Sequence, residues 1–344
     1  MRIKNYLVIA LVCFAVFGMV LQADAGNKNK LGTAGAQELL IPVGSRGTAL
    51  GGAYAAGING VDAIYWNPAG LSNSQHSVEA MVSYMNYIAD INLGYAAVGV
   101  KTGLGWLGFS LKSLSVGDIP VTTEDAPDGT GATFTPNFMT IGLTYSRAMT
   151  DRIYVGANLN VVSEQISRAT ASAFAVDLGV QYLTDFGVKL GVAMKNFGPS
   201  MQFSGTELER EVYLPDTDPN APPRRLALPS MKMELPSQFE IGLSYEMKPM
   251  ENANLILAGN FVNQNFGHDQ MCGGAEFAFQ DMFFLRGSYL YQTDIKTEDN
   301  LWGPAFGFGF KYGLGANAGM SFDYTYRTAQ YFSGNNLFTL KFLF

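Results

Sequence analysis

Charged residues, histidine and cysteine are all scarce in this chain. Charged residues make up 15% of the sequence, against about 25% in soluble proteins. The formal net charge is −7, which argues against nucleic-acid binding because that function needs basic patches. The histidines, His76 and His268, have no second histidine or cysteine at ligand spacing, so a zinc site is not predicted. A serine hydrolase built around one of them stays open only as a minor alternative.

Long apolar runs are also lacking, except for one at the start of the chain. A basic region over residues 2–4 precedes an apolar stretch over 6–21 and a small-x-small cleavage site over 23–25. This pattern predicts a secretory signal peptide over 1–25. The alternative, a membrane anchor, would need about 20 apolar residues. Cleavage would leave Cys272 as the only cysteine, so no intrachain disulfide is expected.

Strand-like alternation dominates the rest of the chain and is clearest at its end. Side chains of a strand alternate between its two faces. One face of the closing segment carries Phe338, Leu340, Phe342 and Phe344, and the other carries Thr339 and Lys341. The pattern predicts an outer-membrane β-barrel closing on itself, with Phe342 and Phe344 read by the assembly machinery. The alternative is an edge strand of a soluble sandwich.

Fourteen alternating segments follow residue 75. They cover roughly 76–88, 91–101, 104–115, 135–148, 152–166, 171–183, 187–196, 237–247, 252–265, 269–280, 282–293, 303–312, 316–328 and 335–344. The connections after even-numbered segments are short, whereas those over 116–134 and 197–236 are long. Outer-membrane barrels sort short periplasmic turns and long outer loops in this way. We therefore predict an all-β, antiparallel transmembrane barrel of about fourteen strands over 76–344.

The inward faces of this barrel are expected to be polar. Asp323 and Arg327 share one face of a segment, and charges do not face lipid cheaply. We expect the lumen carboxylates to form ion pairs with nearby cations. The expected carboxylates are Asp177, Glu240 and Asp323, and the expected cations are Lys189, Lys311 and Arg327.

Residues 26–75 are the candidate to fill this lumen, because a fourteen-stranded wall leaves space that its side chains do not fill. The segment lacks sustained alternation and is rich in glycine and alanine. Asn67-Pro68 predicts a turn within it. Arg46 is expected to pair with a lumen carboxylate or backbone carbonyls, and Trp66 either anchors this plug or lines a ligand wall.

The same segment resembles the PorV/PorQ family of outer-membrane proteins, relatives of the FadL fatty-acid transporters. The resemblance rests on Gly44-x-Arg46-x-x-Ala49-x-Gly51-Gly52-Ala53 and on Tyr65-Trp66-Asn67-Pro68-Ala69-Gly70-Leu71. In FadL-like proteins a similar Asn-Pro-Ala-Gly segment lies in a hatch inside a fourteen-stranded barrel. The residues taken as the hatch motif are Arg46, Gly51, Gly52, Trp66, Asn67, Pro68 and Gly70.

Family resemblance implies a non-enzymatic protein with no cofactor, but leaves its role open. PorV-like barrels imply work with the type IX secretion system, with translocon subunits or secreted cargo as partners. FadL kinship implies passage of hydrophobic small molecules such as long-chain fatty acids. An uncharacterised structural barrel is the third hypothesis. All three place the protein in the outer membrane, in contact with its lipid and with the barrel assembly machinery.

Overall fold

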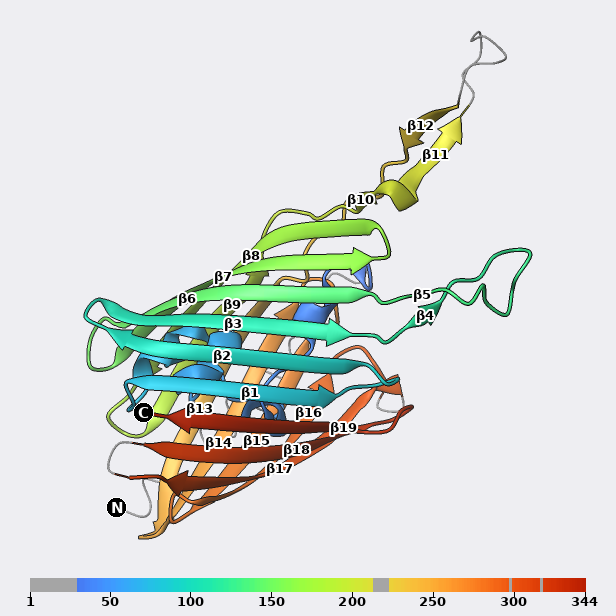
Figure 1. Cartoon of the computed structure of the whole chain (residues 1–344). Coiled ribbons are helices and arrows are strands. Elements are labelled where there is room, and N and C mark those ends of the chain that lie inside the picture. The colour runs from blue at the N-terminus through green and yellow to red at the C-terminus, as the bar shows by residue number, and fades with distance from the viewer. Residues whose placement is uncertain (1–29, 213–222, 297–298, 316–317) are drawn as a thin grey trace.

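The chain forms a closed antiparallel β-barrel of fourteen long strands (Figure 1). The computed structural model describes residues 30–212, 223–296, 299–315 and 318–344, so the predicted signal peptide lies outside the described residues. The strands are β1 (Val78–Asn86), β2 (Asn92–Thr102), β3 (Gly105–Ser115), β6 (Asn137–Ala148), β7 (Ile153–Ile166), β8 (Ala169–Leu183), β9 (Val188–Phe197), β13 (Gln238–Met250), β14 (Ala253–Gln264), β15 (Gln270–Phe279), β16 (Phe283–Gln292), β17 (Trp302–Gly313), β18 (Gly319–Ala329) and β19 (Asn335–Leu343). The predicted fold class is confirmed, and each strand falls on one of the fourteen predicted segments.

Each strand pairs with its neighbours in sequence, and the last strand pairs with the first. β19 runs antiparallel to β1, with Phe342 opposite Ala80 and Phe338 opposite Tyr84. The backbone of Phe344 completes this seam, since its N–H donates to the Val78 carbonyl and its own carbonyl accepts from the Val78 N–H. Closure leaves the wall without an open edge, as a hydrocarbon environment requires.

Alternation decides which face of each strand points outward. On β8, Ala171, Ala173 and Ala175 are buried inside, whereas Phe174 and Val176 are exposed on the outer surface. On β18, Asp323 is buried inside as predicted from its polarity. β14, whose sequence gives no clear choice between Leu255 and Ile256, turns Ile256 toward the interior core.

The connections sort to the two ends of the barrel as the sequence predicts. The C-terminus lies at the end with short turns, the periplasmic rim, and both long loops project from the opposite end, the outer rim (Figure 1). One loop carries β4 (Ile119–Pro120) and β5 (Thr133–Phe134). The other carries β10 (Ser204–Gly205), which extends the sheet beside β8, then η5 (Thr206–Leu208) and the hairpin of β11 (Glu209–Val212) and β12 (Arg224–Ala227).

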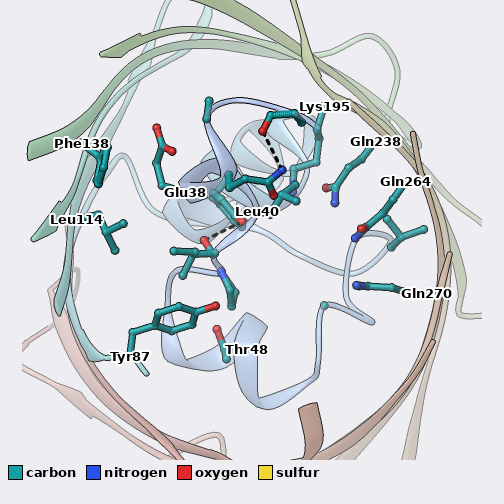
Figure 2. Close-up of a pocket in the computed structure, with 18 of the residues that line it drawn as sticks. Glu38, Leu40, Thr48, Tyr87, Leu114, Phe138, Lys195, Gln238, Gln264 and Gln270 are labelled. Carbon is teal, nitrogen blue, oxygen red and sulfur yellow. Dashed lines mark hydrogen bonds between the residues drawn. The ribbon is translucent and has the colours of Figure 1, made fainter. Parts of the chain in front are cut away.

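The segment before β1 lies inside the ring of strands (Figure 2). It forms short helices: η2 (Gln37–Leu40), α2 (Ser45–Ala49), η3 (Gly60–Asp62), α3 (Ala63–Trp66) and η4 (Pro68–Asn73). No helix within the described ranges is long and apolar enough to cross a membrane. Side chains of this segment, such as Leu50, Ile58 and Leu71, are fully buried and form one core with the inward side chains of the wall.

Candidate functional site

The N-terminal segment, here the described residues 30–77, crosses the lumen from one rim to the other. At the outer rim, the Lys30 ammonium lies 3.0 Å from Oε1 of Glu234 in the long loop. At the periplasmic rim, the Ser77 N–H donates to the Phe344 carbonyl at 2.7 Å. Any solute passing through the lumen would therefore meet this segment.

A chain of alternating charges ties the N-terminal segment to the wall. Arg46 on α2 pairs with Glu276 on β15, as expected for a lumen carboxylate. Glu276 also pairs with Arg286 on β16, at 2.5 Å, and Arg286 pairs with Asp323 at 2.6 Å. The chain then returns to the segment, since Lys341 on β19 lies 3.6 Å from Asp323 and 2.6 Å from Asp62.

Three of the expected ion-pair partners were wrong. Asp177 accepts hydrogen bonds from the amides of Asn158 and Asn160 and from the Asn196 backbone. Glu240 pairs with Lys195 at 3.3 Å, whereas Lys189 pairs with Glu246. Asp323 pairs with Arg286 and Lys341 instead of Lys311 or Arg327. Register across neighbouring strands, which the sequence did not supply, selects these partners.

The predicted hatch residues cluster where the N-terminal segment touches itself and the wall. Gly51 and Gly52 adopt positive φ of 64° and 82°. A Cβ on Gly51 would lie 2.5 Å from Sγ of Cys272, so only glycine fits between α2 and β15. Trp66 packs over this turn, and its indole N–H donates to the Val43 carbonyl at 3.1 Å.

Asn67 and Pro68 form the predicted turn from α3 into η4. The Asn67 side-chain oxygen accepts from the Ala69 N–H at 3.2 Å, and its amide donates to the Ala55 carbonyl at 2.9 Å. Pro68 occupies the first position of η4, where a missing N–H costs nothing. Gly70 packs directly against the Ile58 carbonyl. These contacts give the motif a packing role within the lumen.

Phe342 and Phe344, predicted to be read during assembly, lie on the outer face of β19 and just beyond its end. Phe342 is half-buried, and Phe344 is 53% exposed at the periplasmic rim. Their side chains are thus available to lipid or to another protein, and their part in assembly stays a prediction.

A cavity of about 670 Å³ occupies the outer half of the lumen, above the N-terminal segment. Figure 2 shows Tyr87, Leu114 and Phe138 facing this space from one side and Gln238, Gln264 and Gln270 from the other. Trp66 also lines it, so this residue both packs the segment and borders the cavity. Sequence reasoning missed the cavity, because its walls come from most strands of the barrel.

Arg327 gives the cavity a half-buried cationic group. Its guanidinium lies 4.0 Å from the centre of the Trp302 ring, which in turn lies 5.6 Å from the Tyr87 ring. Within the described residues, Arg327 has no carboxylate partner. A cation held over an aromatic ring in an apolar cavity is suited to an anionic group on a bound molecule.

Further charged groups lie at the cavity floor and beneath it, in contact with the N-terminal segment. Lys112 on β3 donates to the backbone carbonyls of Glu38 and Ile41 at 2.7 and 2.6 Å. The side chain of Glu38 is buried near Glu164, whose carboxylate accepts from the Ala36 N–H. Burial, together with the Glu164 charge, raises the pKa of Glu38 to about 8.

Comparison with solved structures identifies this architecture. The CymD monoaromatic hydrocarbon channel aligns at a TM-score of 0.55 and 11% identity, over 88% of this chain and 97% of that one. The Pseudomonas putida toluene transporter TodX aligns at 0.53 and 13% identity, over 87% and 96%. A Pseudomonas aeruginosa FadL homologue aligns at 0.50 and 12% identity, over 88% and 98%.

This chain has the fold of the FadL-like outer-membrane channels. It is an integral protein of the outer membrane, because its closed barrel and the outer-membrane barrels that it aligns with both indicate this location. No protein-family model matches the sequence, and no curated protein matches it. The resemblance to the PorV/PorQ family therefore has no support beyond the shared FadL-like fold.

Proposed function

We propose that this FadL-like barrel is a non-enzymatic channel that takes up hydrophobic small molecules across the outer membrane. The cavity of about 670 Å³ carries this proposal. It faces the outer rim and ends on the N-terminal segment, and aromatic and aliphatic side chains line it together with polar ones such as Gln238 and Gln264 and charged ones such as Arg327. Ligand sites combine apolar walls with polar groups that orient the ligand. In this proposal residues 26–75 act as the hatch, a plug beneath the ligand.

Arg327 is the proposed polar contact for the ligand. A long-chain fatty acid would place its carboxylate on this guanidinium and its chain along Leu114 and Phe138. A neutral hydrocarbon, such as the molecules named for the CymD and TodX channels, would use the aromatic lining of Tyr87 and Trp302 instead. Both classes fit the proposal, and Arg327 is the residue that separates them.

A break in the wall beside this cavity supports a lateral exit. β16 and β17 pair only between Phe283–Ser288 and Ala305–Phe310, so their outer halves do not form a ladder. Pro304, in the unpaired part of β17, has no N–H to donate. The Asn300 side chain bridges the break, since its amide donates to the Leu290 carbonyl at 3.5 Å and its oxygen accepts from the Trp302 N–H at 3.2 Å. Fewer hydrogen bonds must break here than elsewhere in the wall for strands to separate.

An uptake assay tests the channel proposal. Cells that lack other hydrophobic channels would express the full chain and receive radiolabelled toluene or oleate. Gln270→Trp places an indole in the cavity and should reduce uptake, whereas Phe239→Trp, on the outer face of β13, should not. Equal uptake by cells with and without the wild-type barrel would refute the proposal.

The lateral exit has a separate test. Tyr289→Cys with Phe306→Cys places outward thiols on β16 and β17 where their pairing ends, and a short reducible crosslinker should block uptake until reductant is added. A matched pair on the fully paired strands β1 and β2, Val82→Cys with Ala96→Cys, should leave uptake unchanged. Full uptake through the crosslinked break would exclude this route.

The type IX secretion hypothesis has less support than transport. Its proposed working surface is the long outer loops over 116–134 and 197–236, and in the described part of these loops the hairpins β4–β5 and β11–β12 project from the barrel (Figure 1). The structural neighbours, however, are named as channels and transporters. Replacing the 197–236 loop by a Gly-Ser link would decide the matter, because loss of secretion with a folded barrel would restore the secretion hypothesis.

A further inference from the structure

A second apolar hollow lies on the outer surface of the barrel, away from the lumen. It is a groove of about 220 Å³ across β13, β14, β15 and β16. Its floor is formed by Gly259 and Gly273, which lie directly opposite each other on β14 and β15. Leu243 flanks this glycine pair on β13 and Tyr289 flanks it on β16. The groove exists because two adjacent strands lack outward side chains at the same level.

The groove has a direction set by the neighbouring rows of side chains. Toward the outer rim it is bounded by Phe261 and Met271, the next outward pair on β14 and β15. Toward the membrane centre the next outward pair on β15 and β16 is Ala275 and Gly287. On β14 the same level carries Leu257, opposite Ala275, so the hollow ends there and spans the two levels of Gly259 and Phe261.

The wall behind the groove is closed, so an occupant can enter the groove only from the membrane side and not from the lumen. β14 and β15 pair without interruption from Ala253–Phe279 to Val262–Gln270. The neighbours of the glycine pair point inward, where Asn260 donates to the Gly52 carbonyl and Cys272 donates to the Gly51 carbonyl. A molecule in the lumen cannot reach the groove through this part of the wall.

We propose that the groove binds one acyl chain of an outer-membrane lipid. The outward face of this barrel is in contact with lipid hydrocarbon, and the groove is a hollow in that face with apolar walls. A chain descending from the outer leaflet would pass Tyr291 and Tyr289 and lie over the glycine pair. Inside the membrane, association is driven by van der Waals packing, and methylenes seated between Leu243, Phe261 and Tyr289 make contacts that a flat wall does not offer.

Gly273→Phe provides a direct test, because an added Cβ at this position meets nothing within 4 Å and the glycine does not adopt positive φ. The phenyl ring would fill the groove without displacing the wall. Gly94→Phe is the matched control, since Gly94 is also a strand glycine near the outer rim with nothing within 4 Å of its added Cβ. It lies on β2, outside the groove.

The measurement is native mass spectrometry of the full chain during stepwise delipidation. The wild type and Gly94→Phe should keep a bound lipid that Gly273→Phe loses. Equal retention by all three proteins, a retained molecule without an acyl chain, or no retained lipid in the wild type would each overturn the proposal. Folding is checked by heat-modifiable migration of each barrel, and a misfolded Gly273→Phe is replaced by Gly273→Leu. The proposal is independent of the channel function, because uptake is not part of the measurement.

Discussion

Arg46 in the lumen and Glu276 on the wall form a two-point ion pair although 230 residues separate them in sequence. The Arg46 Nε donates to one carboxylate oxygen at 2.9 Å and its Nη2 donates to the other at 2.7 Å. The same carboxylate accepts from Arg286, so its charge stays compensated on both sides. This pair and the Lys341–Asp62 pair are direct charged links between the N-terminal segment and the barrel.

Arg46→Gln should loosen the N-terminal segment. Removing one partner of a buried ion pair costs about 3–5 kcal/mol when the other charge is left alone, and the cost here should be smaller because Glu276 keeps Arg286 as a partner. Single-channel conductance in planar bilayers should therefore rise toward that of a barrel lacking residues 26–75. Lys189→Gln breaks the more exposed Lys189–Glu246 pair on the wall and should leave conductance unchanged. If the deletion itself conducts no better than the wild type, another element closes the pore.

Docking of η2 should depend on pH through Glu38. Its pKa is raised from 4.5 to about 8 by burial and by the nearby Glu164, with Lys112 opposing the shift. The docked state thus favours the neutral carboxyl, and docking is strongest below the ordinary pKa of 4.5 and weakens as the pH rises to about 8. Hydrogen exchange of Gln37–Leu40 should accelerate across this window beyond its intrinsic pH dependence. Glu38→Gln should remove the part of this acceleration that exceeds the intrinsic pH dependence. If the variant exchanges with the same pH dependence as the wild type, this account is contradicted.

Arg327→Gln should separate the two ligand classes. A hydrogen bond to a charged group contributes about 1.5–3 kcal/mol, so oleate binding should weaken about tenfold or more. Toluene, which has no charge, should bind as it does to the wild type. Equilibrium binding to the purified barrel measures both. If oleate binding is unaffected, the carboxylate does not contact this guanidinium.

Deletion of Phe344 should impair assembly in the outer membrane. The residue closes the ladder between β19 and β1 at the periplasmic rim, where the assembly machinery is expected to read its exposed ring. Heat-modifiable barrel in membranes should fall in the truncated strain. Phe344→Tyr keeps the backbone contacts and an aromatic ring, so this variant should assemble normally. Equal amounts of barrel in wild-type and truncated strains would contradict the prediction.

The strands of this barrel could be predicted from sequence because each one is specified locally. Alternation along Phe338–Phe344 and the lengths of the connections require no knowledge of distant residues. Even the ambiguous segment over 252–265 folds as β14. The same reasoning limits the partner of Arg46 to a lumen carboxylate or backbone carbonyls, and the structure selects the carboxylate of Glu276.

The ion pairs and the cavity could not be predicted because they depend on register and on long-range closure. Glu276 and Arg286 lie directly opposite each other across the β15–β16 hairpin, a relationship that a one-residue slip would destroy. Lys341 and Asp62 meet only because the last strand closes beside the first. The Trp302 and Arg327 pair in the cavity likewise needs the irregular pairing between β17 and β18, where the register shifts.

The position of the N-terminal segment constrains the order of folding. It leads directly into β1, while its charged anchors, Glu276 and Lys341, come from the last third of the chain. The pairing of β1 with β19 encloses the segment, so it must lie within the curving sheet before that last seam forms. A segment enclosed in this way opens the pore by rearranging in place, with both of its ends still held at the rims.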